Sequence, residues 1–163
     1  MQIDLQTLWY LTVGTLLVSA ALLLWERQAH PGRASVLGIL VGGLVAFVAG
    51  CLVAMNRGHF PVALGMGATN VLMMTGYLMV LNAAAGLDGK RHARWSLCAL
   101  GVLTGVWAIV GAQYPAALWN HVSALPIALA SGLTAWTLLR SRTVKGLRSR
   151  PVAVSVMAVH ALF

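Results

Sequence analysis

The sequence has little charge, and acidic residues are the scarcest class. Of 163 residues, three are Asp or Glu and eleven are Lys or Arg, so charged side chains make up only 9% of the chain. A soluble domain of this size carries about 25% charged residues. Because 60% of the residues are hydrophobic, the chain lacks the polar surface that a folded domain needs in water. A water-soluble enzyme is therefore excluded.

Long uncharged runs are what the sequence has instead. They cover residues 5–25, 34–56, 58–87 and 95–139. About 20 helical residues cross the hydrocarbon core of a bilayer, so the last run is too long for one crossing. The polar turn Gln113-Tyr114-Pro115 divides it in two. We predict an all-α, polytopic membrane helix bundle with five full transmembrane helices, at about 5–25, 35–56, 61–86, 95–112 and 116–139.

A sixth apolar run covers residues 151–163 and is shorter than the others. As a helix it extends roughly 20 Å, which does not cross the ~30 Å hydrocarbon core. We interpret it as an incomplete sixth span and the chain as a fragment. The alternative is a complete small protein that ends in a half-crossing or in an interfacial helix.

The basic residues indicate how the bundle is oriented. Lys and Arg in short connections stay on the cytoplasmic side of the membrane. Ten of the eleven follow the first, third and fifth spans: Arg27, Arg33, Lys90, Arg91, Arg94, Arg140, Arg142, Lys145, Arg148 and Arg150. Only Arg57 lies in an even-numbered connection. We therefore predict that the amino terminus lies outside.

The net charge of +8 also bears on binding partners. Cationic connections near a membrane are attracted to anionic lipid headgroups. Nucleic-acid binding would need a basic patch on a folded soluble module, and the sequence contains no such module. The expected partner is the lipid bilayer, with no nucleic acid.

Small residues are spaced for close helix packing. Gly38 and Gly42 in the second span, and Gly101 and Gly105 in the fourth, have the small-xxx-small spacing that lets membrane helices approach each other. We expect both stripes to face neighbouring helices. Pro126, inside the fifth span, has no N–H for the Val122 carbonyl and predicts a kink there.

Polar residues within the spans are the candidates for a site. Met66, Asn70, Met73 and Tyr77 recur at helical spacing and share one face of the third span. A buried amide in hydrocarbon needs a partner, so Asn70 and Tyr77 either hydrogen-bond to another helix, the interpretation we favour, or bind a small ligand. A ligand pocket would be completed by Trp107, His121 and His160.

The sequence contains no motif that performs chemistry by itself. It has no paired carboxylates, no phosphate-binding loop and no His-x-x-x-His or Cys-x-x-Cys spacing, so we predict no catalytic residue, no metal site and no cofactor. One alternative is a redox protein that binds haem or another cofactor through His121 and His160. Another is a small-substrate carrier, although the spans lack the charged residues that ion-coupled transporters use.

Several segments resemble the amino-terminal membrane half of bacterial membrane-bound diguanylate cyclases. They are Asp4-Leu5-Gln6-Thr7-Leu8, the basic loop 26–33, the run 70–77, and Arg148-Ser149-Arg150-Pro151 leading to His160-Ala161-Leu162-Phe163. The resemblance implies a sensory or anchoring module in the bacterial inner membrane. It also implies a homodimer, a small-molecule or lipid signal, and a cytoplasmic GGDEF effector domain beyond residue 163. The GGDEF sequence itself is absent from these residues.

Overall fold

The computed structural model describes residues 5–90, 92–146 and 149–162, and within those ranges the chain is helical with no β-strand. The predicted residues Asp4, Arg91, Arg148 and Phe163 lie outside them. The elements in chain order are α1 (Leu5–Ala29), η1 (Pro31–Arg33), α2 (Ala34–Met55), η2 (Arg57–His59), α3 (Val62–Gly86), α4 (Ala93–Val110), α5 (Pro115–Ala117), η3 (Leu118–Val122), α6 (Ala124–Arg140) and α7 (Arg150–Leu162).

Five helical segments are long and apolar enough to cross a membrane: Thr7–Ala29, Pro31–Met55, Val62–Gly86, Ala93–Val110 and Pro115–Arg140. Large apolar side chains also cover the outside of the bundle. On α4, for example, Leu97 is 68% exposed and Ile109 is 80% exposed. Contiguous apolar surface of this kind is covered by lipid. The predicted all-α membrane helix bundle is confirmed.

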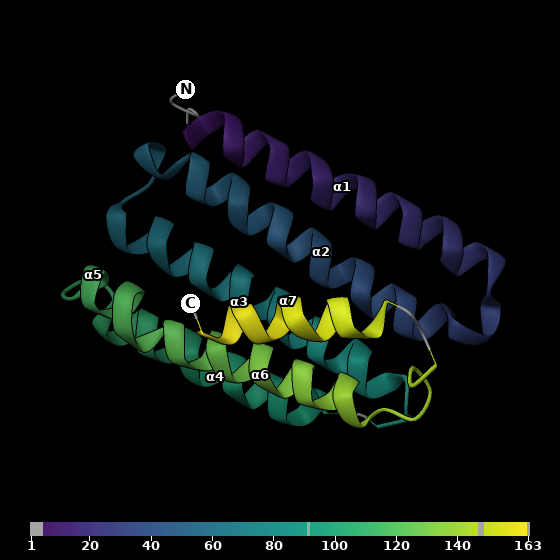
Figure 1. Ribbon diagram of the computed structural model, residues 1–163. Helices are drawn as coiled ribbons and strands as arrows, with labels where there is room; N and C mark the ends of the chain where they lie inside the picture. The colour runs from purple at the N-terminus through teal and green to yellow at the C-terminus, as the bar shows by residue number, and fades with distance from the viewer. Residues whose placement is uncertain (1–4, 91, 147–148, 163) are drawn as a thin grey trace.

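The long helices alternate in direction, so their connections gather at two ends (Figure 1). The connections after α1, α3 and α6 lie at one end and contain most of the basic residues, and we call this the cationic end. The connections after α2 and α4 lie at the opposite end. Of the Lys and Arg residues, these connections contain Arg57. The basic residues that follow the first, third and fifth spans in the sequence are therefore gathered at one end of the bundle.

Glycines let α2 and α3 pack closely. A Cβ at Gly43 would lie 3.2 Å from the Gly76 carbonyl oxygen, and one at Gly76 would lie 2.7 Å from the Phe47 ring. Of the stripe expected in the second span, Gly42 faces Met79 of α3 and Gly38 faces the Arg27 side chain of α1. In a membrane, small residues at such a seam allow the dispersion contacts that hold helices together.

The second predicted stripe faces away from the rest of the described chain. Gly101 and Gly105 have no atom of the described chain near the position of a Cβ, so the expectation that they pack against a neighbouring helix of this chain is wrong. The reason is that α4 turns its bulky face inward, with Leu103 and Trp107 buried. At the cationic end, Asn82 of α3 holds α4 by donating from Nδ2 to Ser96 Oγ over 2.7 Å.

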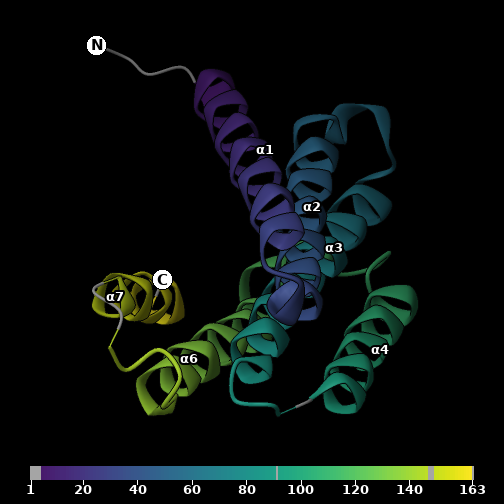
Figure 2. The same ribbon diagram turned by 90° about the vertical axis from the view of Figure 1, so that its right-hand side faces the viewer.

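Helix α7 lies against α6 and runs in the opposite direction, starting from the cationic end (Figure 1). Arg150, its first residue, donates hydrogen bonds to the carbonyl oxygens of Leu138 and Leu139. These carbonyls end α6 without helical partners, so a cation there satisfies them and complements the helix dipole. Viewed from the cationic end, α7 and α4 lie at opposite edges of the bundle (Figure 2).

One carboxylate ties two connections together at the cationic end. Asp88, between α3 and α4, accepts hydrogen bonds from Ser141 Oγ over 2.9 Å and from Thr143 Oγ1 over 3.0 Å. Thr143 also donates to the Leu87 carbonyl oxygen over 3.1 Å. The short connection that leads from α6 toward α7 is therefore anchored to the end of α3.

Candidate functional site

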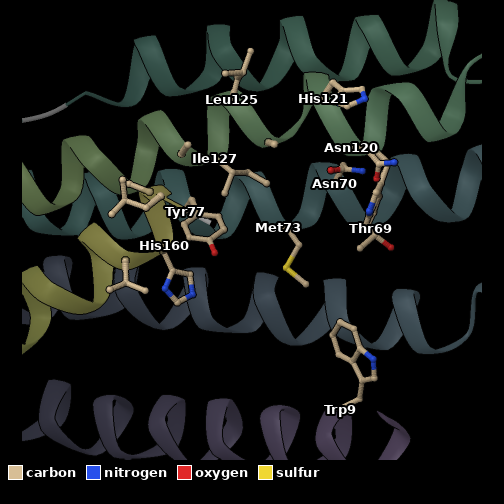
Figure 3. Close-up of a pocket in the computed structure, with 16 residues that line it drawn as sticks. Trp9, Thr69, Asn70, Met73, Tyr77, Asn120, His121, Leu125, Ile127 and His160 are labelled. Carbon is tan, nitrogen blue, oxygen red and sulfur yellow. The ribbon is translucent and has the colours of Figure 1, made fainter.

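A cavity of about 920 Å³ lies between α1, α3, the turn that precedes α6, α6 and α7 (Figure 3). Its size falls in the range of small-molecule sites, roughly 300–1,000 Å³. Its lining residues come from four parts of the fold: Trp9 of α1; Thr69, Asn70, Met73 and Tyr77 of α3; Trp119, Asn120, His121, Ala124, Leu125, Ile127 and Ala128; and Val159, His160, Ala161 and Leu162 of α7.

The structure brings four of the five predicted pocket residues to this cavity: Asn70, Tyr77, His121 and His160. Trp107 is elsewhere, buried in the core at 6% exposure. Its Nε1 donates to Ser123 Oγ over 3.1 Å, and its ring covers Gly67 of α3. Trp107 therefore connects α4 to the start of α6. The cavity lies on the other side of α3.

A widened turn positions one wall of the cavity. Residues Leu118–Val122 form a π-helical turn, closed by a 2.9 Å hydrogen bond from the Ser123 N–H to the Leu118 carbonyl oxygen. Pro126 offers no N–H to Val122, and its ring crowds that carbonyl, so the distortion predicted from Pro126 lies in the turn before it. Such turns are frequent at functional sites. Here the turn carries Trp119, Asn120 and His121 to the cavity.

Asn70 has only part of its hydrogen-bonding capacity in use. It is 4% exposed, and its Nδ2 donates over 3.0 Å to the Met66 carbonyl oxygen of its own helix. The favoured expectation of a hydrogen bond from Asn70 to another helix is therefore wrong, and Asn82 makes that kind of bond instead. Among the described residues, no donor reaches Asn70 Oδ1, and Asn70 lines the cavity.

Tyr77 and His160 close the other end of the cavity. The Tyr77 ring packs edge to face on Phe47, with centroids 4.9 Å apart, and lies 6.2 Å from the His160 ring. The Tyr77 hydroxyl points to the side where His160 lies (Figure 3). His160 Nδ1 lies 3.1 Å from the Val156 carbonyl oxygen. Since a carbonyl only accepts, Nδ1 carries the proton in this contact, and in the tautomer protonated at Nδ1 alone Nε2 is an acceptor.

The two histidines lie at opposite ends of the cavity, with Met73 and Ile127 between them (Figure 3). Two axial ligands of one haem iron would have to face each other across the metal, and this pair does not. In the residues that the structure describes, no group of three or more His, Cys, Asp or Glu is placed to hold a metal ion.

Sequence reasoning missed the rim residues contributed by other elements. Trp119 is fixed from outside the cavity, because the Arg57 guanidinium stacks over its ring at 4.0 Å. Partial burial in this position lowers the pKa of Arg57 from its usual value. A signal was present: Asn120, His121 and Ser123 interrupt an otherwise apolar span a few residues before Pro126. Trp9 gives no such signal, because its place at the cavity depends on how α1 packs.

The fold and its apolar surface define a multi-pass α-helical membrane protein. In comparisons with known proteins, the chain matches no family, no curated protein and no solved structure.

Proposed function

We propose that this chain is the sensory membrane module of a bacterial signalling protein in the inner membrane. It resembles the membrane half of a diguanylate cyclase, and in that role it would control a cytoplasmic GGDEF domain. A small ligand in the cavity changes how α7 packs on α6. The change reaches the effector through the chain beyond α7.

The orientation of the bundle supports this proposal. The cationic end faces the cytoplasm, because basic connections are retained there. The cavity, lined by Trp9 of α1 and by the turn before α6, would then lie toward the outer side of the bilayer. A signal from outside would reach it without crossing the membrane.

The observation that carries the proposal is that α7 forms part of the cavity wall. Val159, His160, Ala161 and Leu162 line it, while the same helix packs on α6 and is joined to α6 by the short connection anchored at Asp88. A ligand shifts a conformational equilibrium only if it binds the two states with different affinity. Because α7 contacts the cavity directly, any movement of α7 changes the contacts that a ligand makes.

A homodimer completes the mechanism. The diguanylate cyclases that this chain resembles make cyclic di-GMP from two GTP molecules, one held by each of two GGDEF domains. In a dimer of this chain, a shift of α7 changes how the two attached domains meet. An anchoring role without sensing is the simpler alternative, and it predicts that filling the cavity has no effect on output.

The test fills the cavity and reads the output. Because α7 begins at the cationic end and ends at the cavity, we would extend the whole chain with apolar residues that complete this span and with one returning transmembrane helix. A GGDEF domain joined to that helix lies in the cytoplasm, and cyclic di-GMP is measured in cells. Ala128→Trp places a large side chain in the cavity and should change the output by about fivefold or more, the low end of typical allosteric coupling. The matched control is Ala108→Trp, since Ala108 faces away from the bundle on α4.

The control should leave the output unchanged. Equal output from Ala128→Trp, Ala108→Trp and the unmodified chain, with all three inserted in the membrane at equal amounts, would contradict the proposed sensory function and leave anchoring.

A further inference from the structure

We infer that the cavity binds an uncharged, elongated amphiphile with a hydroxyl group at each end, such as an aliphatic diol or a molecule of quinol type. This inference rests on the proposed function in that it names the class of ligand for the same cavity. It follows from three properties of the lining: the absence of fixed charge, the position of the polar groups, and the kind of hydrogen bond that those groups lack.

The first property is charge. None of the sixteen lining residues is Asp, Glu, Lys or Arg. A charged ligand at this depth would have no counter-charge, and an unpaired charge in a membrane interior is costly. The ligand that fits is uncharged.

The second property is the arrangement of polar groups. Thr69, Asn70, Asn120 and His121 gather at one end of the cavity, and Tyr77 and His160 at the other (Figure 3). Asn70 and Tyr77 are seven residues apart on α3, which is about 10 Å along a helix. Met73 and Ile127 lie between the two polar ends. A complementary ligand has an apolar middle and two polar groups separated by about that length.

The third property is that both ends offer acceptors. At one end Asn70 Nδ2 donates one of its two N–H groups to Met66, which leaves the second N–H to donate and Oδ1 to accept. At the other end Nδ1 of His160 is turned to the Val156 carbonyl oxygen, which leaves Nε2 to accept. Polar atoms away from water need partners, so the matching ligand carries a hydrogen-bond donor at each end. A hydroxyl is an uncharged donor that also accepts, so it matches the remaining N–H of Asn70 as well.

The experiment is photolabelling of the whole chain in lipid nanodiscs with an octanol that carries a diazirine. Mass spectrometry locates the adducts. We expect them to be enriched on Met73, Tyr77 and His160 over the lipid-facing Val102 and Ile109 of α4. Octanediol with terminal hydroxyls should compete at concentrations roughly fivefold or more below those needed by its dimethyl ether, because each lost donor removes one intramembrane hydrogen bond.

Two variants assign the ends independently. Asn70→Leu and His160→Phe each remove one acceptor and should each reduce the advantage of the diol over its dimethyl ether. If Asn70→Leu does not fold, His160→Phe still tests the other end, because that side chain lies on the exposed part of α7. Octanoate and octylammonium should compete more weakly than the diol.

The inference is overturned if the ether or octanoate competes as well as the diol, or if adducts are spread evenly over α4. Failure here is separate from failure of the proposed function. Cavity adducts with the expected competition, together with unchanged output from Ala128→Trp, would retain the ligand class and remove the sensory role. Changed output with scattered adducts would do the reverse.

Discussion

Helix α3 packs against its neighbours in two different ways. Toward α2, glycines bring the backbones close enough that a single methyl group at Gly76 would collide with Phe47. Toward α6 and α7, the same helix leaves a cavity of about 920 Å³. The first interface is held by close packing of small residues. The second contains the cavity, and the π-helical turn and α7 form part of its wall.

The difference separates a rigid seam from a surface that can accommodate a ligand. Cores close-packed at small residues respond strongly to added volume. A preformed cavity has room for added atoms instead. Variants that add volume on one side of α3 or the other should therefore have opposite consequences, and the following predictions use that contrast.

The largest effect is expected in the α2–α3 seam. Gly76→Leu should lower the free energy of unfolding by about 1–3 kcal/mol, the usual cost of overpacking, because its side chain meets the Phe47 ring. The measurement is equilibrium unfolding of the purified chain in detergent micelles. The matched control is Gly105→Leu, where the described chain leaves open space; equal losses in the two variants would mean that the seam is not close-packed as described.

A smaller effect is expected where Trp107 fastens α4. Trp107→Phe keeps an aromatic ring over Gly67 but removes the hydrogen bond to Ser123. Hydrogen bonds between membrane helices average about 0.6 kcal/mol, so a loss of roughly that size is expected in the same unfolding assay. Trp95→Phe serves as control because Trp95 is 78% exposed. A larger loss from the control would contradict the assignment.

The smallest effect is expected at the cationic end and depends on pH. The hydrogen bond from Ser141 is the main cause that holds the pKa of Asp88 below its usual value of 3.8. Desolvation opposes it, and hydrogen bonds from Thr143 and the charge of Lys90 add to the lowering. A lowered folded-state pKa means that the contribution is complete above the ordinary value and is lost as pH falls through the folded one.

Hydrogen exchange of the connection 141–146 is the measurement for this prediction. After correction for intrinsic rates, protection should be constant from neutral pH down to about 4 and should fall below that. Asp88→Asn should show the reduced protection at every pH. Protection that falls already near neutral pH in the unmodified chain would assign the change to a group other than Asp88.

Most of the fold could be predicted from hydropathy because the bilayer fixes the length of each helix. The expected third span, 61–86, is α3 at Val62–Gly86, and the fourth, 95–112, is α4 at Ala93–Val110. Helix contacts were less predictable. Spacing shows that Gly101 and Gly105 share a face, but it does not show that Leu103 and Trp107 turn the opposite face toward α3.

The candidate site was predictable in part for the same reason. Asn70 and Tyr77 could be grouped because they share a face of one helix, and both line the cavity. The contribution of Trp9 depends on how α1 packs, and that of Trp119 on a π-helical turn whose position no spacing rule gives. The hydrogen bond of Asn70 to Met66 was missed because an amide in hydrocarbon can be satisfied by its own helix as well as by a neighbour.

The proposed function and the place of the ligand both require that the cationic end faces the cytoplasm while the opposite end faces outward. Single-cysteine variants test this directly in cells, in a background of Cys51→Ala and Cys98→Ala, with a maleimide that does not cross the inner membrane. Gly58→Cys should react in intact cells whose outer membrane has been permeabilised, and Lys90→Cys should react only after lysis. Reaction of both variants from the same side would contradict the account.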